Sequence, residues 1–314
     1  MSSHSHETAA DTDTAAEEQG ATPARTKEPM PAPAATAAPI RPRDRSFYTW
    51  LLVITLLGLA WRVAYVLIWR RDMVVWGDPY FYHRGGVLLA EGRGWINPFI
   101  WDLRGTVYEA ADHPPVYLLY LAGVTKVFGQ SVLTHLLAST VIGAGSVYLA
   151  GLAGRQVAGK RIGLIAAVIA AVYPNMWNWD GLLLSETTAI FAVLLVIWLA
   201  YRFWRTPTLW GGAWLGAAIG FAVLTRAEVL LLSVFVVVPL VLARRIGSWK
   251  RRLGWLTMSG AACVAVLTPW VAHNLSRYDQ PVLLSNGFEI TLATSTCDET
   301  FYTERIGWWS LECS

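Results

Sequence analysis

Charged residues are scarce in this chain, and their scarcity excludes an ordinary soluble domain. Only 15% of the 314 residues are Asp, Glu, Lys or Arg, whereas 54% are hydrophobic. Several apolar runs approach or exceed the roughly 20 residues that cross about 30 Å of hydrocarbon. The formal net charge of +3 is small, and the basic residues lie in short clusters between apolar runs, which is typical of membrane topology. We therefore expect an all-α polytopic helical bundle in a lipid bilayer and no nucleic-acid partner.

Cysteine is also rare, since the chain has only three, too few for a disulfide framework. Cys263 lies inside an apolar run and is expected to be a small core residue. Cys297 and Cys313 lie in the polar C-terminal segment, which the topology below places outside the cell, where a disulfide can persist. The sequence leaves open whether these two residues pair.

Several motifs are missing as well. The sequence has no Walker loop, no strand-linked Gly-x-Gly-x-x-Gly and no Gly-x-Ser-x-Gly elbow. A nucleotide-using cytoplasmic domain is therefore missing. No internal repeat is visible, and charges crowd near the outer helix ends, whereas a transporter should show repeated halves and charges in mid-span. A transporter or a non-catalytic cell-envelope assembly protein remains the alternative to an enzyme.

The apolar runs predict seven membrane spans. Residues 1–46 lack Phe, Trp and Tyr, so we expect a disordered tail, and arginines at 41, 43 and 45 place that tail in the cytoplasm by the positive-inside bias. The expected spans are 47–69, 132–152, 162–173, 186–204, 209–224, 229–243 and 253–270. A transmembrane domain at 47–273 then has an outer loop at 70–131, and residues 274–314 form an extracytoplasmic segment.

The charge pattern supports this count. With 115–128 treated as an interfacial helix, basic clusters near Arg155, Arg202 and Arg244 all fall on the cytoplasmic side. Arg62 lies within the first span, where a lipid-facing charge would be costly. It either extends to the outer interface or faces inward as the partner of an acidic or phosphate group.

The outer loop carries the residues that we consider for chemistry. Asp78 precedes Pro79, and Asp112 lies before His113 and a proline pair, so each carboxylate is next to a helix start where its pKa can be shifted. The structural alternative is that Asp78 is an N-cap and that the prolines only begin a helix. His83 and His113 could join the aspartates as metal ligands. No helix-spaced ligand pair supports a metal, so we assign no metal site and no certain cofactor and keep a divalent metal as an alternative.

Three further charged residues mark predicted outer helix ends. Glu186 and Glu228 would be costly at the entry to a span unless paired. Arg226 is a candidate ligand for an anionic group, because guanidinium groups bind phosphate well. The alternative is an ion pair of Arg226 with Glu228 or Glu186.

Four short motifs resemble a known family. They are Gly77-Asp78 and His113-Pro114-Pro115 in the outer loop, the end of a glycine-rich span at 154–161, and Ser185-Glu186 at the start of a later span. Together they resemble the multi-spanning GT-C glycosyltransferases of the protein O-mannosyltransferase and aminoarabinose transferase type, glycosyltransferase family 39. The resemblance covers about residues 47–290.

The resemblance implies a mannosyltransferase-like enzyme of the plasma membrane that moves a hexose or pentose from a polyprenyl-phosphate donor to a protein, lipid or glycan acceptor on the outer side. The acidic catalytic residue of the family's first outer loop matches Asp78. The Asp-Glu of many members is Asp78-Pro79 here, so Asp112 or Glu186 would supply a second carboxylate.

We expect Asp78 to be the base and Arg226 a phosphate ligand, with Tyr82, His113 and Glu228 as further binding residues. Family members usually have more than seven spans, and this chain ends without a closing helix. A fragment that lacks the later spans is expected to be inactive.

Overall fold

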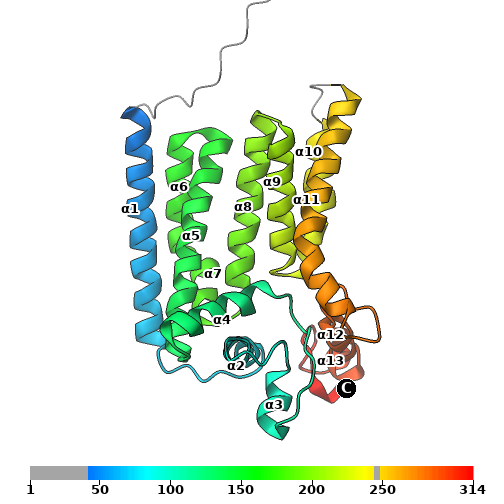
Figure 1. Ribbon diagram of the computed structural model, residues 1–314. Helices are drawn as coiled ribbons and strands as arrows, with labels where there is room; N and C mark the ends of the chain where they lie inside the picture. The colour runs from blue at the N-terminus through cyan, green and yellow to red at the C-terminus, as the bar shows by residue number, and fades with distance from the viewer. Residues whose placement is uncertain (1–41, 244–247, 314) are drawn as a thin grey trace, which may run out of the picture. The chain divides into compact units, whose positions relative to one another are not determined.

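The computed structural model describes residues 42–243 and 248–313. Most of these residues are helical, and none of them belongs to a β-strand. Helical segments lie side by side along the bundle in Figure 1. They are α1 (Pro42–Tyr65), α5 (Val132–Ala158), α6 (Lys160–Val172), α8 (Glu186–Arg205), α9 (Leu209–Val223), α10 (Val238–Ala243) and α11 (Trp249–Leu275). Short π-helical turns, Val66–Arg70 and Ser233–Val237, continue α1 and precede α10. The all-α helical fold expected from the sequence is confirmed.

Four helices are long and apolar enough to cross a membrane: Arg45–Arg70, Val132–Ala158, Glu186–Arg205 and Trp249–Leu275. A fifth span results if Lys160–Val172 is joined to Pro174–Gly181, which follows it at a bend of 63°. The segments Leu209–Val223 and Ala227–Leu242 are apolar but shorter. The protein is therefore a multi-pass membrane protein, and the count of seven spans stays a prediction.

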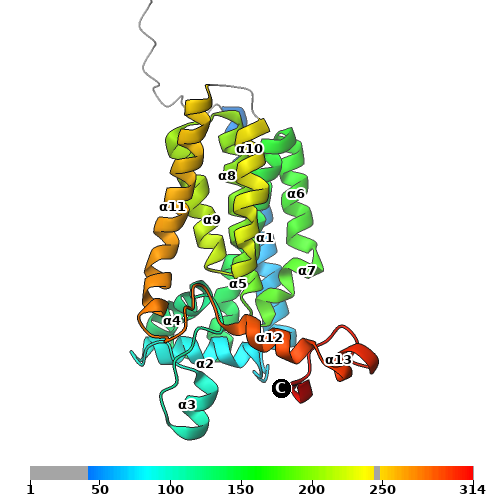
Figure 2. The same ribbon diagram turned by 90° about the vertical axis from the view of Figure 1, so that its right-hand side faces the viewer.

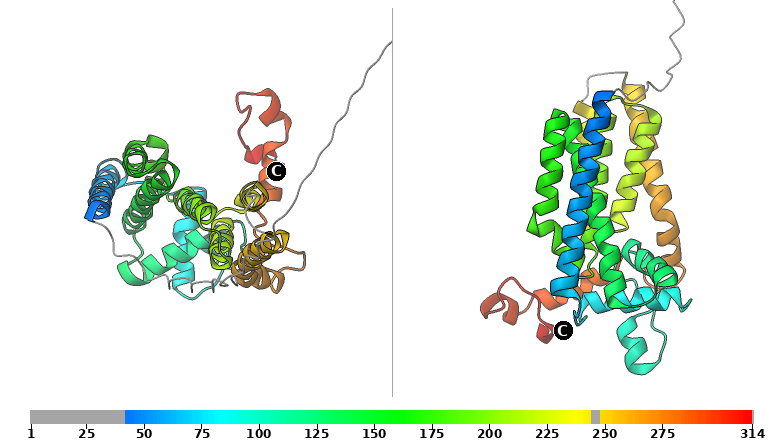
Figure 3. Two further views of the ribbon diagram at one scale, coloured as in Figure 1. Left: turned by 90° about the horizontal axis from the view of Figure 1, so that it is seen from above. Right: turned by 90° about the vertical axis from the view of Figure 1, so that its left-hand side faces the viewer.

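The bundle has two packed parts. Seen end-on in Figure 3, α1 lies beside α5 and α6, and α9 lies beside α11. Leu51 of α1, Val147 of α5 and Ala167 of α6 are fully buried in the first part. The second part packs α8, α9, α10 and α11 around buried residues such as Val196, Ile219 and Trp255. Glycines allow the close helix approaches that association within lipid requires.

Three helices lie at one end of the bundle: α2 (Asp78–Ala90), α3 (Pro98–Arg104) and α4 (Val116–Phe128). Helices α2 and α4 run across that end, and α3 projects away from it (Figures 1 and 2). The position of α4 agrees with the expectation that residues 115–128 form an interfacial helix. Helix α3 was not expected. Asn97 caps it by accepting hydrogen bonds from the N–H groups of Phe99 and Ile100, and proline at the first position favours a helix start.

The expected tail lies outside the described residues except for 42–46, which already belong to α1. After α11, two short helices follow, α12 (Gly287–Ser295) and α13 (Asp298–Tyr302). Cys297 and Cys313 are joined by a disulfide with an S–S distance of 2.06 Å. Cys263 is a buried free thiol, in accord with a core residue.

Basic residues gather at the end of the bundle opposite α2. The α5–α6 and α8–α9 connections and the start of α11 all lie there in Figure 1. They carry Arg155, Arg161, Arg202 and Arg251. By the positive-inside bias this end would face the cytoplasm.

Candidate functional site

The candidate site lies at the end of the bundle that α2 and α4 cover. A backbone hydrogen bond from Val116 N–H to the Leu224 carbonyl, 3.0 Å, joins the start of α4 to the turn after α9. The loop with His113 is thereby held next to the turn with Arg226. Asp78 at the start of α2 and Glu186 at the start of α8 complete the cluster through the interactions below. The structure thus brings together residues that lie far apart in the sequence.

Asp78 lies beside His113. The His113 Nε2 atom is 3.6 Å from Oδ1 of Asp78, whose side chain is 64% exposed. The His113 imidazole, and then the charge of Arg226, lower the pKa of the Asp78 carboxyl. Helix α2 begins at Asp78, and Gly77, at φ +62°, takes the capping position, so the interpretation of Asp78 as an N-cap is wrong.

Arg226 pairs with both glutamates. Its Nη1 donates to Glu186 Oε1 at 2.6 Å, and its Nε donates to Glu228 Oε1 at 2.5 Å. The ion pair that the sequence left as an alternative is therefore present. Nη2 has no hydrogen-bond partner among the residues that the structure describes, and neither does the buried Oε2 of Glu186. Nη2 is therefore free to bind a polar substrate group, whereas Oε2 of Glu186 is shielded by the protein.

Tyr82 is buried at the centre of this group of charges. Its ring centroid lies 4.8 Å from that of His113, and the side chain is 2% exposed. Burial raises the pKa of the Tyr82 hydroxyl, and Ser185, Asp78 and Glu186 act on it as well. The phenol therefore stays protonated at neutral pH and can donate a hydrogen bond.

Asp112 is held by the segment that follows α11. Asn286 N–H donates to the Ala111 carbonyl at 2.9 Å, and a Cβ on Gly287 would lie 2.7 Å from the Asp112 carbonyl oxygen. Burial raises the pKa of Asp112, and the Asp78 charge adds to the rise. The two carboxylates are therefore shifted in opposite directions.

His83 lies outside the site. Its Nδ1 atom is 3.0 Å from Nδ1 of His135, whose Nε2 is 2.8 Å from the Thr125 hydroxyl. The interpretation that His83 and His113 share a metal with the aspartates is therefore wrong. Within residues 42–243 and 248–313, no three His, Cys, Asp or Glu side chains are grouped so that they could hold a metal ion.

Arg62 forms a buried ion pair, which the sequence predicted only as one of two alternatives and without naming the partner. Arg62 is fully buried, and its Nε donates to Asp180 Oδ2 at 2.8 Å. The Thr187 hydroxyl donates to the other Asp180 oxygen at 3.1 Å. Arg62 thus faces inward toward an acidic group. An arginine within a membrane span is expected to have a carboxylate partner. This expectation was the sequence signal that could have led to Asp180.

More than half of the chain matches a known protein family. Residues 112–273, more than half of the chain, match the model of the family described as dolichyl-phosphate-mannose-protein mannosyltransferase. No curated protein matches the chain significantly. The matched region contains Asp112, His113, Glu186 and Arg226, and the helices are those of a multi-pass membrane protein. The chain therefore belongs to the dolichyl-phosphate-mannose-protein mannosyltransferase family of membrane glycosyltransferases, which use a lipid-linked sugar.

Proposed function

We propose that the protein transfers a sugar from a polyprenyl-phosphate donor to a hydroxyl of a protein, lipid or glycan acceptor on the outer side of the plasma membrane. The observation that carries this proposal is that the exposed carboxylate of Asp78, which lies beside His113, and the guanidinium of Arg226 belong to one cluster at the end of the bundle, close enough for the Arg226 charge to lower the pKa of Asp78. A base and a cation are the two groups that this transfer needs.

The reaction is a displacement at the anomeric carbon. Asp78 takes the proton of the acceptor hydroxyl, and the acceptor oxygen forms the new glycosidic bond. The bond from the anomeric carbon to the phosphate oxygen breaks, and its electron pair leaves with the polyprenyl phosphate. Attack on the face opposite the leaving group inverts the configuration. Arg226 stabilises the negative charge that develops on the phosphate.

The opposite pKa shifts of the two aspartates support Asp78 as the base. His113 and Arg226 lower the pKa of Asp78, so that carboxyl is ionised at neutral pH. Burial raises the pKa of Asp112, so its carboxylate is protonated at a higher pH than that of Asp78 as the pH falls. Asp78 is also the more exposed of the two, so an acceptor can reach it.

The remaining residues orient the donor. Glu186 and Glu228 hold two nitrogens of Arg226, which leaves Nη2 for a phosphate oxygen. The protonated Tyr82 and the imidazole of His113 can donate to the same substrate. The resemblance to the protein O-mannosyltransferase and aminoarabinose transferase type supports a hexose or pentose as the sugar.

The test compares Asp78→Asn with wild type in membranes that carry the longest native form of the protein. Transfer from radiolabelled polyprenyl-phosphate sugars is measured at equal membrane abundance. We expect Asp78→Asn to lose about 100-fold or more of the rate, since general base catalysis contributes roughly 10²–10⁴-fold. Asp72→Asn is the matched control, because Asp72 is an exposed carboxylate at the start of the same loop.

Either of two results would contradict the proposal. Equal transfer by Asp78→Asn and wild type would remove Asp78 from the chemistry. No transfer by wild type from any labelled donor would favour a transporter or an assembly protein instead.

A further inference from the structure

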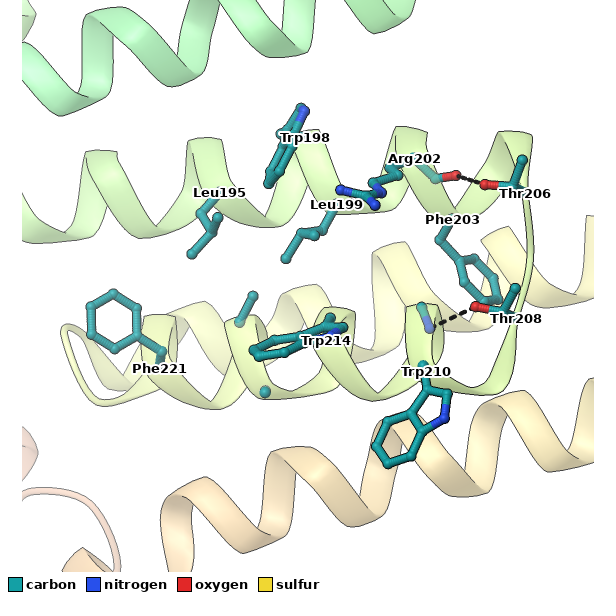
Figure 4. Close-up of a pocket in the computed structure, with 13 residues that line it drawn as sticks. Leu195, Trp198, Leu199, Arg202, Phe203, Thr206, Thr208, Trp210, Trp214 and Phe221 are labelled. Carbon is teal, nitrogen blue, oxygen red and sulfur yellow. Dashed lines mark hydrogen bonds between the residues drawn. The ribbon is translucent and has the colours of Figure 1, made fainter. Parts of the chain in front are cut away.

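A cavity of about 700 Å³ lies between α8 and α9, away from the candidate site. Figure 4 shows it beside the connection that joins the two helices. Its volume is within the roughly 300–1,000 Å³ of small-molecule sites. None of the residues that we assign to sugar transfer lines it.

The cavity is apolar along most of its length and polar at one end. The polar residues are Arg202, Thr206 and Thr208, next to the α8–α9 connection. The other lining residues are mainly aromatic and aliphatic, among them Leu195, Trp198, Leu199, Trp210, Trp214 and Phe221. A ligand that fits this lining has one polar headgroup and a long apolar part.

Arg202 gives the polar end its charge. Its guanidinium points into the space between α8 and α9 in Figure 4, and its Cζ lies 5.7 Å from the ring centroid of Trp198. Thr208 accepts a hydrogen bond from Gly211 N–H at 2.9 Å, so its own hydroxyl proton remains available. Thr206 donates to the Arg202 carbonyl at 3.3 Å. The end of the cavity therefore presents a cation and a hydroxyl donor.

Exposed aromatic rings show that the cavity opens to the surroundings of the bundle. Trp210 is 74% exposed and Trp214 is 66% exposed. Tryptophan is enriched where a membrane protein meets the headgroup region. Because α8 is a candidate membrane span, lipid is the medium that reaches this opening.

We propose that this cavity binds a phospholipid with an anionic headgroup. The phosphate pairs with the Arg202 guanidinium, whose planar fork suits phosphate oxygens, and the Thr208 hydroxyl donates to the same headgroup. One acyl chain lies along Leu195, Leu199 and Phe221. Basic pockets between membrane helices are known to take such headgroups. A free phosphate ion would leave the apolar length of the cavity uncovered.

The test measures lipid binding to the purified full chain by native mass spectrometry in a zwitterionic detergent. Phosphatidylglycerol and phosphatidylcholine with identical acyl chains are titrated separately. We expect phosphatidylglycerol to bind the wild type more tightly, and Arg202→Gln to weaken that binding about fivefold. The loss for phosphatidylcholine should be smaller, because its choline cation already neutralises the phosphate. Arg161→Gln is the matched control, since Arg161 is exposed at the same end of the bundle and does not line the cavity.

A second variant tests the apolar part. Ala217 lines the cavity, and Ala217→Phe should weaken the binding of both lipids by filling the space of the acyl chain. Equal affinities of wild type for the two lipids would overturn the proposal, as would equal losses in Arg202→Gln and Arg161→Gln. Displacement of bound phosphatidylglycerol by millimolar inorganic phosphate would show a site for a free anion and would likewise overturn it.

Discussion

At the scale of single residues, burial determines how strongly the loss of one ion-pair partner destabilises this protein. Arg62 to Asp180 and Arg84 to Asp102 have the same Nε to Oδ2 distance, 2.8 Å. The first pair is 0% and 1% exposed, and the second is 27% and 32% exposed. Loss of one partner leaves an uncompensated charge only in the buried pair, because water and salt screen the exposed one.

We therefore expect Asp180→Asn to lower the free energy of unfolding by about 3–5 kcal/mol. Asp102→Asn is the matched control and should cost about 0–1 kcal/mol. The measurement is the thermal midpoint of the detergent-solubilised protein, followed by fluorescence-detected size-exclusion chromatography. Replacing both buried partners in Arg62→Leu/Asp180→Leu should recover much of the loss. Equal effects of Asp180→Asn and Asp102→Asn would show that the buried pair is not structurally important.

If Asp78 is the base, the pKa of its carboxyl sets the acid limb of the transfer rate. His113 is the largest cause of the lowered pKa of Asp78, and a lowered pKa keeps the carboxylate ionised as the pH falls. His113→Gln removes this cause, so the acid limb of the transfer rate should move to higher pH. His83→Gln is the control, because His83 contacts His135 and not Asp78. An acid limb unchanged by His113→Gln would mean that another group sets it.

At the scale of helices, a glycine stripe holds α9 against α11. Gly212, Gly216 and Gly220 recur every fourth residue on one face of α9. A Cβ on Gly216 would lie 1.9 Å from the backbone oxygen of Ser259, and one on Gly220 would lie 2.9 Å from that of Cys263. Small residues at this spacing let helix backbones approach closely in lipid.

Gly216→Ala should therefore push the two helices apart and lower the free energy of unfolding by about 1–3 kcal/mol, as overpacking does. Gly260→Ala, within α11, is the matched control. A Cβ there has no neighbour within 4 Å, so alanine should be neutral or should stabilise the helix by up to about 1 kcal/mol. The measurement is again the thermal midpoint of the detergent-solubilised protein. An equal decrease of the midpoint in Gly260→Ala and Gly216→Ala would contradict the packing argument.

The helices themselves could be predicted from the sequence much better than their contacts. Apolar runs and proline or glycine positions indicate most of the bundle, because each of these signals is local. The inward face of Arg62 could not be assigned, since its partner Asp180 is 118 residues away. Helix α3 was missed because seven residues carry too little apolar pattern, although the Asn97-Pro98 pair signals a helix start.

At the scale of the whole described chain, the candidate site arises from the fold. Asp78, His113 and Arg226 belong to three separate segments, and the hydrogen bond from Val116 to Leu224 holds the last two together. The sequence named these residues from their chemistry and from family resemblance. It could not show that Glu186 and Glu228 hold Arg226 jointly, because that depends on the start of α8 lying beside the turn after α9.

The orientation of the bundle in the membrane connects the site with its substrates. The site and the basic clusters lie at opposite ends, so if the basic end faces the cytoplasm the site faces outward. Val107 lies in the loop between α3 and α4 and is 64% exposed, and Arg161 is exposed at the other end. In intact cells a membrane-impermeant maleimide should label Val107→Cys and not Arg161→Cys, which should react only after permeabilisation.

Native cysteines should interfere little with this measurement. Cys297 and Cys313 are joined in a disulfide, and Cys263 is buried, so the unmodified chain is a suitable blank. Labelling of Arg161→Cys but not Val107→Cys in intact cells would place the candidate site in the cytoplasm. An outer acceptor could not then reach Asp78, and the proposed transfer on the outer side would be wrong even if the protein transferred sugar in isolated membranes.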